Sequence, residues 1–145
     1  MKATPDEPRR DTMLFAYFFE DHKEFKPKVA AITQRMEEHG DTLCTSVFTV
    51  GEVLAGPNRT QHWDEISEVR AFFRSPDLRL LEFKLSTAEI FGEIQAQRGI
   101  SSGDAIHLAC AAEARVDLFL THDKRLAKKI VPGIQPIATL DTHIL

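Results

Sequence analysis

The apolar positions of this chain recur with two different spacings, which predict alternating helices and strands. Pro27 stands where a helix commonly begins, and Val29, Ile32 and Met36 follow it at helical spacing. Gly40 then supplies a stop for the pattern. The sequence therefore predicts an amphipathic helix after Pro27.

Further helices are predicted by the same spacing and by their end signals. Residues 47–54 follow Ser46, a suitable N-cap, and we expect this helix to end at Gly56 and Pro57. Residues 63–73 carry a third apolar stripe. Later in the chain, Ser86 and Glu89 form a capping box for a helix that stops at Gly99, and a small-residue helix follows Ser101. A short basic helix is expected at 124–129.

Strands are predicted between these helices. Residues 43–45 are a short candidate, 78–83 alternate with period two, 116–120 form an apolar run, and 137–140 are the last candidate. The first apolar segment, 13–19, is expected to be buried as a strand end or a first helical turn. Strands joined by helices imply crossover connections, so we predict an α/β fold with a central parallel sheet flanked by helices.

Length and composition favour one globular unit. The chain has 145 residues, of which 43% are hydrophobic, and this is the size of a single domain with its own core. We expect residues 1–10, which are polar and contain two prolines, to be disordered, and residues 11–145 to form a single domain. No apolar run approaches the roughly 18 residues of a membrane span, so a soluble, cytoplasmic protein without membrane contact is predicted.

Charge and cysteine content limit the chemistry. The formal net charge of -4 gives no global signature of nucleic-acid binding, so a polyanion would need a local basic patch. Such a patch exists in the sequence at Lys124, Arg125, Lys128 and Lys129, which would hold RNA phosphates or form a solvated helix face. The two cysteines are far apart, which argues against a zinc site and for a reducing compartment.

Four acidic residues are candidates for a common site. Asp104 lies in the first turn of its helix, Asp123 follows the strand at 116–120, and Glu52 lies in the helix that leaves the strand at 43–45. Asp11 would join them if a strand runs into it. Ligands of parallel sheets gather beyond the carboxyl ends of the strands, so the four acids are predicted to meet at one edge.

Each acid taken alone also has a structural interpretation. Asp104 would favour the helix dipole, Asp123 would be a turn residue, and Glu52 would be a solvated helix residue. Together, however, crowded carboxylates need a cation to remain ionised, and an all-oxygen ligand set favours Mg²⁺ or Mn²⁺. The chemistry predicted is hydrolysis of a phosphodiester.

Four segments in register resemble one known family. They read DTMLF from Asp11, TSVFTVGEVLAG over 45–56, DAIHLA from Asp104 and FLTHD over 119–123. The chain resembles the PIN domain, especially the VapC-type ribonuclease toxins of type II toxin-antitoxin systems. It departs from the family pattern at Met13 and His122, where Asn is common, and before Asp11, where polar residues replace an apolar strand.

The resemblance implies a PIN-like three-layer fold and Mg²⁺- or Mn²⁺-dependent cleavage of RNA. It also implies a metal site and catalytic cluster of Asp11, Glu52, Asp104 and Asp123, supported by the hydroxyls of Thr12 and Thr121. A cognate antitoxin and a homodimer are the implied protein partners.

Alternative interpretations come from other classes of protein. One is a PIN-like binding module with a weakened site that acts through a protein partner. A haloacid-dehalogenase-type phosphatase is disfavoured because Met13 replaces the second Asp of that signature, and a receiver domain because the first strand lacks an acidic pair. His107, three residues after Asp104, would be either a metal ligand or a packed, hydrogen-bonded core residue.

Overall fold

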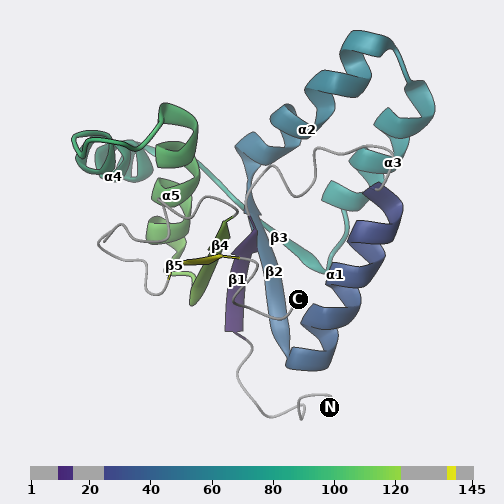
Figure 1. The fold of residues 1–145 in the computed structure, drawn as a ribbon, viewed down its shortest axis with the longest axis horizontal. Coiled ribbons are helices and arrows are strands. Elements are labelled where there is room, and N and C mark those ends of the chain that lie inside the picture. The colour runs from purple at the N-terminus through teal and green to yellow at the C-terminus, as the bar shows by residue number, and fades with distance from the viewer. Residues whose placement is uncertain (1–9, 15–24, 122–136, 140–145) are drawn as a thin grey trace.

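The computed structural model describes residues 10–14, 25–121 and 137–139, in which strands and helices alternate along the chain (Figure 1). The elements are β1 (Arg10–Leu14), α1 (Phe25–His39), β2 (Asp41–Ser46), α2 (Val47–Thr60), α3 (Trp63–Phe73), β3 (Leu78–Leu81), α4 (Leu85–Gln95), α5 (Ser102–Ala114), β4 (Leu118–Thr121) and β5 (Ile137–Thr139). Residues 1–9 and the basic helix predicted at 124–129 lie outside the described residues.

Within the described residues the strands form one five-stranded sheet in the order β3-β2-β1-β4-β5, and every pair is parallel. The chain adds β2 and β3 on one side of β1 and then β4 and β5 on the other. We call the edge at which β2 ends at Ser46, β3 at Leu81 and β4 at Thr121 the carboxyl edge. In open parallel sheets, such an edge is where ligands bind, near the point at which the strand order reverses.

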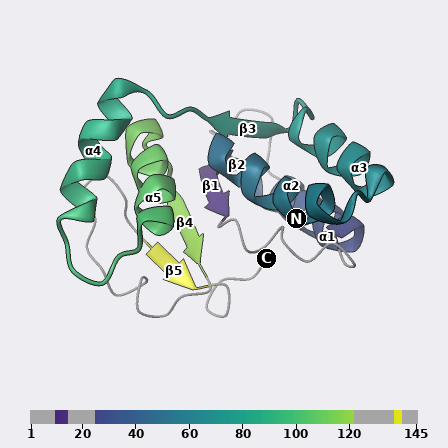
Figure 2. The same cartoon turned by 90° about the horizontal axis from the view of Figure 1, so that it is seen from above.

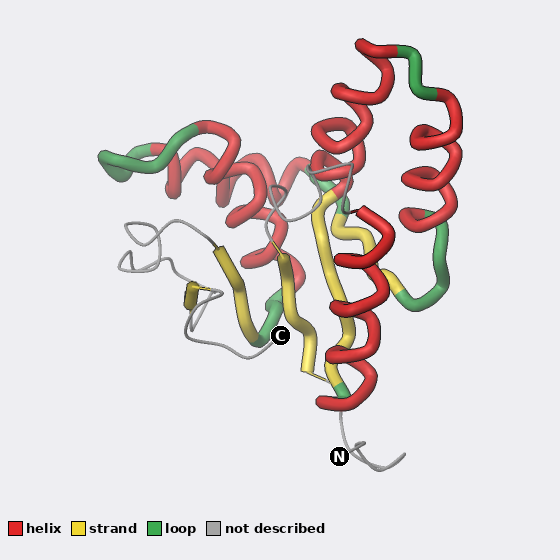
Figure 3. Tube along the Cα trace, turned by 45° about the vertical axis from the view of Figure 1, so that its right-hand side comes forward, coloured by secondary structure: helices red, strands yellow, loops and turns green. Residues whose placement is uncertain are grey.

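Helices cover both faces of the sheet, with α1, α2 and α3 on one side and α4 and α5 on the other (Figures 2 and 3). The strands supply alternate side chains to the two faces, as a pleated strand must. Leu43 and Leu118 pack in the core cluster under α1 to α3, whereas Cys44 and Phe119 pack in the cluster under α4 and α5. The predicted three-layer α/β fold with a parallel sheet is confirmed.

The predicted end of α2 at Gly56 and Pro57 is wrong. The helix continues to Thr60 and ends at Gln61, whose φ of 56° is left-handed. Pro57 is buried within the helix on the same side as Thr49 and Val53. Packing of this buried side therefore outweighs the backbone hydrogen bond that a proline cannot donate.

The predicted capping box of Ser86 and Glu89 is also wrong. The N-cap of α4 is Lys84, two residues earlier, and its backbone N–H donates to Thr87 Oγ1 at 3.0 Å. The hydroxyl of Ser86 instead donates to Glu113 of α5. The register of the cap is therefore set by the buried threonine, while Ser86 links α4 to α5.

The predicted stop of α4 at Gly99 is wrong as well, because the helix ends at Gln95. The predicted end of α1 and the predicted start of α5 agree with the structure. Helix α1 ends before Gly40, whose φ is 71°, and Ser101 is the N-cap of α5. Arg10, which falls in the segment expected to be disordered, is the first residue of β1 and forms two hydrogen bonds with Asp41, at 3.1 and 2.7 Å. No helix in the described part of the chain is long and apolar enough to cross a membrane.

Candidate active site at the carboxyl edge of the sheet

Glu52 and Asp104 both lie near the carboxyl edge. Helix α2 starts directly after β2, so Glu52 lies in the second turn beyond that strand. Asp104 is the third residue of α5, and its backbone N–H donates to the hydroxyl of Ser101 at 3.2 Å. A carboxylate in this first turn interacts favourably with the positive end of the helix dipole.

His107 joins these two helices. It lies one turn after Asp104 on the same face of α5, and its side chain is only 1% exposed. Its Nε2 atom lies 2.5 Å from Oε1 of Glu52, and its Nδ1 atom lies 2.7 Å from Oγ of Ser46. Glu52 thereby contacts the residue that lies one turn after Asp104 on α5.

These contacts favour one of the two interpretations of His107. Both ring nitrogens have protein partners, so neither is left for a metal ion. His107 is the packed, hydrogen-bonded residue rather than a ligand. Its contact with Ser46 could not be read from the sequence, although the spacing from Asp104 identified His107 as a neighbour of the site.

The hydroxyls at the end of β2 are also buried. Thr45 Oγ1 donates to Thr49 Oγ1 at 2.8 Å, and this hydrogen bond links the end of β2 to the first turn of α2. Ser46 is the N-cap of α2 by position, yet its side chain makes no capping hydrogen bond. Its hydroxyl instead contacts His107.

Asp11 lies away from these residues. No strand runs into it, because β1 begins at Arg10 and Asp11 is its second residue, beside Thr42 near the start of β2. Its carboxylate accepts a hydrogen bond from Arg79 at 2.6 Å, and its backbone N–H donates to Asp117 at 2.7 Å. The condition on which Asp11 was predicted to join the other acids, a strand that runs into it, is therefore not met, and Asp11 does not lie at the carboxyl edge.

The remaining predicted residues differ in position. Thr12 is buried between Leu43 and Leu118 in the sheet, and its hydroxyl has no hydrogen-bond partner among the described residues. Thr121 ends β4 at the carboxyl edge, but its side chain lies outside what the structure describes. The same holds for all atoms of Asp123, Lys124, Arg125, Lys128 and Lys129.

The carboxylates present fit a hydrated divalent cation with few protein ligands. In the described part of the chain, no group of three or more His, Cys, Asp or Glu residues is arranged to hold a metal. Mg²⁺, however, often uses only one or two carboxylates and completes its shell with water and phosphate oxygens. Glu52 and Asp104 supply two carboxylates near the carboxyl edge, whereas Asp11 lies away from it.

The cysteines fit no metal site. Both are buried, and burial is the main cause that raises the pKa of Cys44 to about 12 and that of Cys110 to about 11. The nearby charge of Asp11 raises the pKa of Cys44 further. Because metal ions bind thiolates rather than thiols, these protonated side chains are poor ligands at neutral pH.

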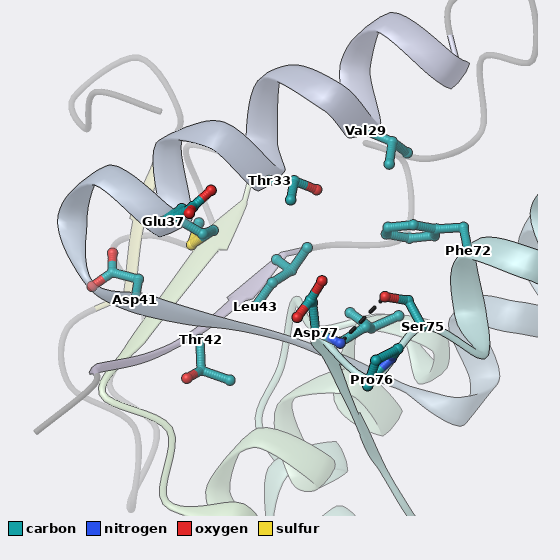
Figure 4. A pocket seen from close by; sticks show the side chains of 12 residues that line it. Val29, Thr33, Glu37, Asp41, Thr42, Leu43, Phe72, Ser75, Pro76 and Asp77 are labelled. Carbon is teal, nitrogen blue, oxygen red and sulfur yellow. Dashed lines mark hydrogen bonds between the residues drawn. The ribbon is translucent and has the colours of Figure 1, made fainter. Parts of the chain in front are cut away.

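A cavity of about 690 Å³ lies elsewhere, between α1, the first residues of β2 and the segment after α3 (Figure 4). Val29 and Thr33 line it from α1, Asp41 from β2, and Phe72 and Asp77 from the opposite side. None of the predicted site residues lines this cavity. It is therefore separate from the group formed by Glu52, His107 and Asp104.

The fold and its acids define the class of this protein as a three-layer α/β protein with acidic residues at the carboxyl edge of its sheet. The PIN domain family model matches residues 11–130. The chain belongs to the PIN domain family. A search of curated proteins gives no significant match.

Two solved structures resemble the chain over most of its length. One is VapBC2 from Rickettsia felis bound to a DNA fragment from their promoter, with 14% sequence identity and a TM-score of 0.63 over 89% of this chain and 98% of that chain. The other is a toxin-antitoxin complex from Klebsiella pneumoniae, with 18% identity and a TM-score of 0.61 over 84% and 93% of the two chains. At such identities the similarity is one of fold.

Proposed function

We propose that this protein is a metal-dependent endoribonuclease that hydrolyses RNA phosphodiester bonds as the toxin of a toxin-antitoxin pair. The proposal is carried by one observation: Glu52 and Asp104, from helices far apart in the sequence, lie at the carboxyl edge, with buried His107 between them. Membership of the PIN domain family and the toxin-antitoxin complexes among similar folds support it.

In this proposal Glu52 and Asp104 hold Mg²⁺ or Mn²⁺, and Asp123 completes the cluster. When bound, such an ion polarises phosphate oxygens and lowers the pKa of a coordinated water. The chain's own task is to hold two carboxylates close together, which is unfavourable without a cation. Asp11, Thr12 and Thr121 remain proposed members from the family pattern, and Asp11 would have to leave Arg79 to join.

The substrate must overcome the negative charge of this edge. RNA phosphates and the two carboxylates repel each other, so binding depends on the cation and on nearby basic residues. We assign the second task to Lys124, Arg125, Lys128 and Lys129, which follow β4 in the sequence. Replacing any of them should weaken RNA binding more at low salt than at high salt, because counterion release is reduced.

The test is cleavage of RNA by purified wild-type protein and the Asp104→Asn variant in Mn²⁺, Mg²⁺ or chelator. This change removes the charge and nearly keeps the shape. The matched control is Asp64→Asn, which removes an acid from the first turn of α3, away from the carboxyl edge. We expect metal-dependent cleavage by the wild type and the control and none by Asp104→Asn; equal cleavage by all three would refute the proposal.

A second candidate function is a PIN-like binding module that acts through a protein partner. One observation favours it: Asp11, the first acid of the family pattern, is held by Arg79 and by Asp117, the residue before β4, rather than at the carboxyl edge. A folded wild-type protein that binds neither Mn²⁺ nor RNA would support this alternative.

The proposed partners are an antitoxin and a second copy of the chain, in the cytoplasm. Large apolar side chains are exposed on the described surface, with Trp63 64% and Leu85 80% exposed. Sedimentation of the purified protein, alone and with the product of a neighbouring gene, tests both partners. A monomer that binds no such product would remove the toxin role and leave the nuclease role standing.

A further inference from the structure

The group of Ser46, His107 and Glu52 contains two deeply buried polar side chains near the proposed site. Ser46 is 0% exposed and His107 is 1% exposed, whereas the side chain of Glu52 is 40% exposed. The three residues come from the end of β2, from α5 and from α2. Buried polar groups are costly unless hydrogen-bonded, and here both nitrogens of the imidazole are satisfied.

The chemistry of the carboxylate fixes the direction of one of these two hydrogen bonds. An ionised carboxylate can only accept, so Nε2 of His107 carries a hydrogen and donates it to Oε1 of Glu52. In the neutral ring, Nδ1 then accepts from the hydroxyl of Ser46. The Ser46 hydroxyl is thereby used to hold the ring and not to cap α2.

A serine, a histidine and a carboxylate in this order resemble the triad of acyl-transfer enzymes, but the exposure is reversed. In such a triad the serine meets the substrate and the acid is buried. Here the serine is inaccessible and the acid faces solvent. The two hydrogen bonds therefore hold the solvent-facing carboxylate of Glu52 and do not prepare the buried serine for a substrate.

We infer that His107 is a positioning residue that fixes the carboxylate of Glu52 for cation binding, with Ser46 holding the ring from behind. This inference rests on the proposed function. A free Glu side chain samples many rotamers, so a contact that fixes one rotamer in advance reduces the conformational entropy lost when an ion binds. The contact with His107 uses Oε1, and we assign Oε2 to the ion.

Two substitutions separate the two contacts of the ring. In His107→Gln the amide nitrogen replaces Nε2 and can still donate to Glu52. In His107→Asn the shorter amide replaces Nδ1 and can still contact Ser46, but it does not reach Glu52. Both variants keep a polar group in the same buried space, so their difference reports on Glu52 more than on packing.

The measurement is the dissociation constant for Mn²⁺ by titration calorimetry, with RNA cleavage measured in parallel and folding checked by urea unfolding. Residues that orient a metal ligand typically change metal affinity 10- to 100-fold when replaced. We expect His107→Asn to bind Mn²⁺ about 10- to 100-fold more weakly than wild type, and His107→Gln to stay within a few-fold of it. Equal affinity of His107→Asn and wild type would overturn the inference.

A second measurement needs no variant at His107. In the wild type, the ¹⁵N resonance of His107 Nε2 should shift when Mg²⁺ is added, and this shift should disappear in Asp104→Asn. A resonance that does not move while Mg²⁺ binds would also overturn the inference. If wild-type protein binds neither ion, the proposed function itself fails, whereas ion binding with an insensitive His107 refutes only the positioning role.

Discussion

Replacing Thr12 by Val removes a buried hydroxyl while keeping the branched shape of the side chain. Thr12 is 1% exposed, between Leu43 and Leu118 on the face of the sheet that packs under α1 to α3. Its Oγ1 has no partner among the described residues. Leaving such a group unsatisfied costs about 1–3 kcal/mol. We therefore expect Thr12→Val to raise the free energy of unfolding by about 1–3 kcal/mol.

Urea and thermal unfolding measure this change. For a domain slightly larger than this one, each kcal/mol raises Tm by about 2–4 °C, so a rise of several degrees is expected. Thr49→Val is the matched control, because Thr49 is equally buried but its hydroxyl accepts from Thr45. The control should lose about 0.5–1.5 kcal/mol, the usual net value of one hydrogen bond.

A loss of stability in Thr12→Val similar to that in Thr49→Val would refute this reasoning, since it would mean that the Thr12 hydroxyl has a hydrogen-bond partner. RNA cleavage by the same variant tests the role that the family pattern gives to Thr12. A stabilised but inactive variant would indicate a hydroxyl retained for function at the expense of stability.

Three further outcomes are expected. The free energy of unfolding should fall as pH rises above about 9, because the folded state keeps the thiol protons of Cys44 and Cys110 that the unfolded chain releases. In urea titrations between pH 7.5 and 10.5, the free energy of unfolding of the Cys44→Ala variant should fall less steeply than that of the wild type. Arg79→Gln should cost no more than about 1 kcal/mol, because its ion pair with Asp11 is partly exposed, and a larger loss in urea would contradict this. Trp63→Ser should change the free energy of unfolding by less than about 0.5 kcal/mol, and any loss of self-association seen by sedimentation would assign the exposed indole to an interface.

The layers of the fold were predictable because they depend on local periodicity. Helical spacing identified α1 and α3, and alternation identified β3, since each pattern reflects which side of an element is buried. The end of α2 was not predictable in this way. Pro57 is a local stop signal, but its buried position beside Val53 decides the outcome, and that depends on contacts with other elements.

The same distinction between local sequence pattern and contacts between elements applies to the candidate site. Glu52 and Asp104 were predictable because each follows directly from the end or start of an element whose type the sequence indicates. The link through His107 joins residues 55 and 61 positions apart, so it needed the packing of α5 against β2 and α2. No local pattern reports such a contact.

Asp11 shows how a local motif and the tertiary arrangement can differ. The motif that begins at Asp11 predicts a strand that ends there, but the residues before it are polar, whereas Met13 after it is fully buried. The strand accordingly spans Arg10–Leu14, and the Arg10–Asp41 and Asp11–Arg79 ion pairs form along its first residues. With β1 in this register, Asp11 lies beside Thr42, four residues before the Ser46 that contacts His107. A nuclease site built from all four acids therefore requires β1 to shift toward the carboxyl edge, whereas a site built on Glu52 and Asp104 requires no such movement.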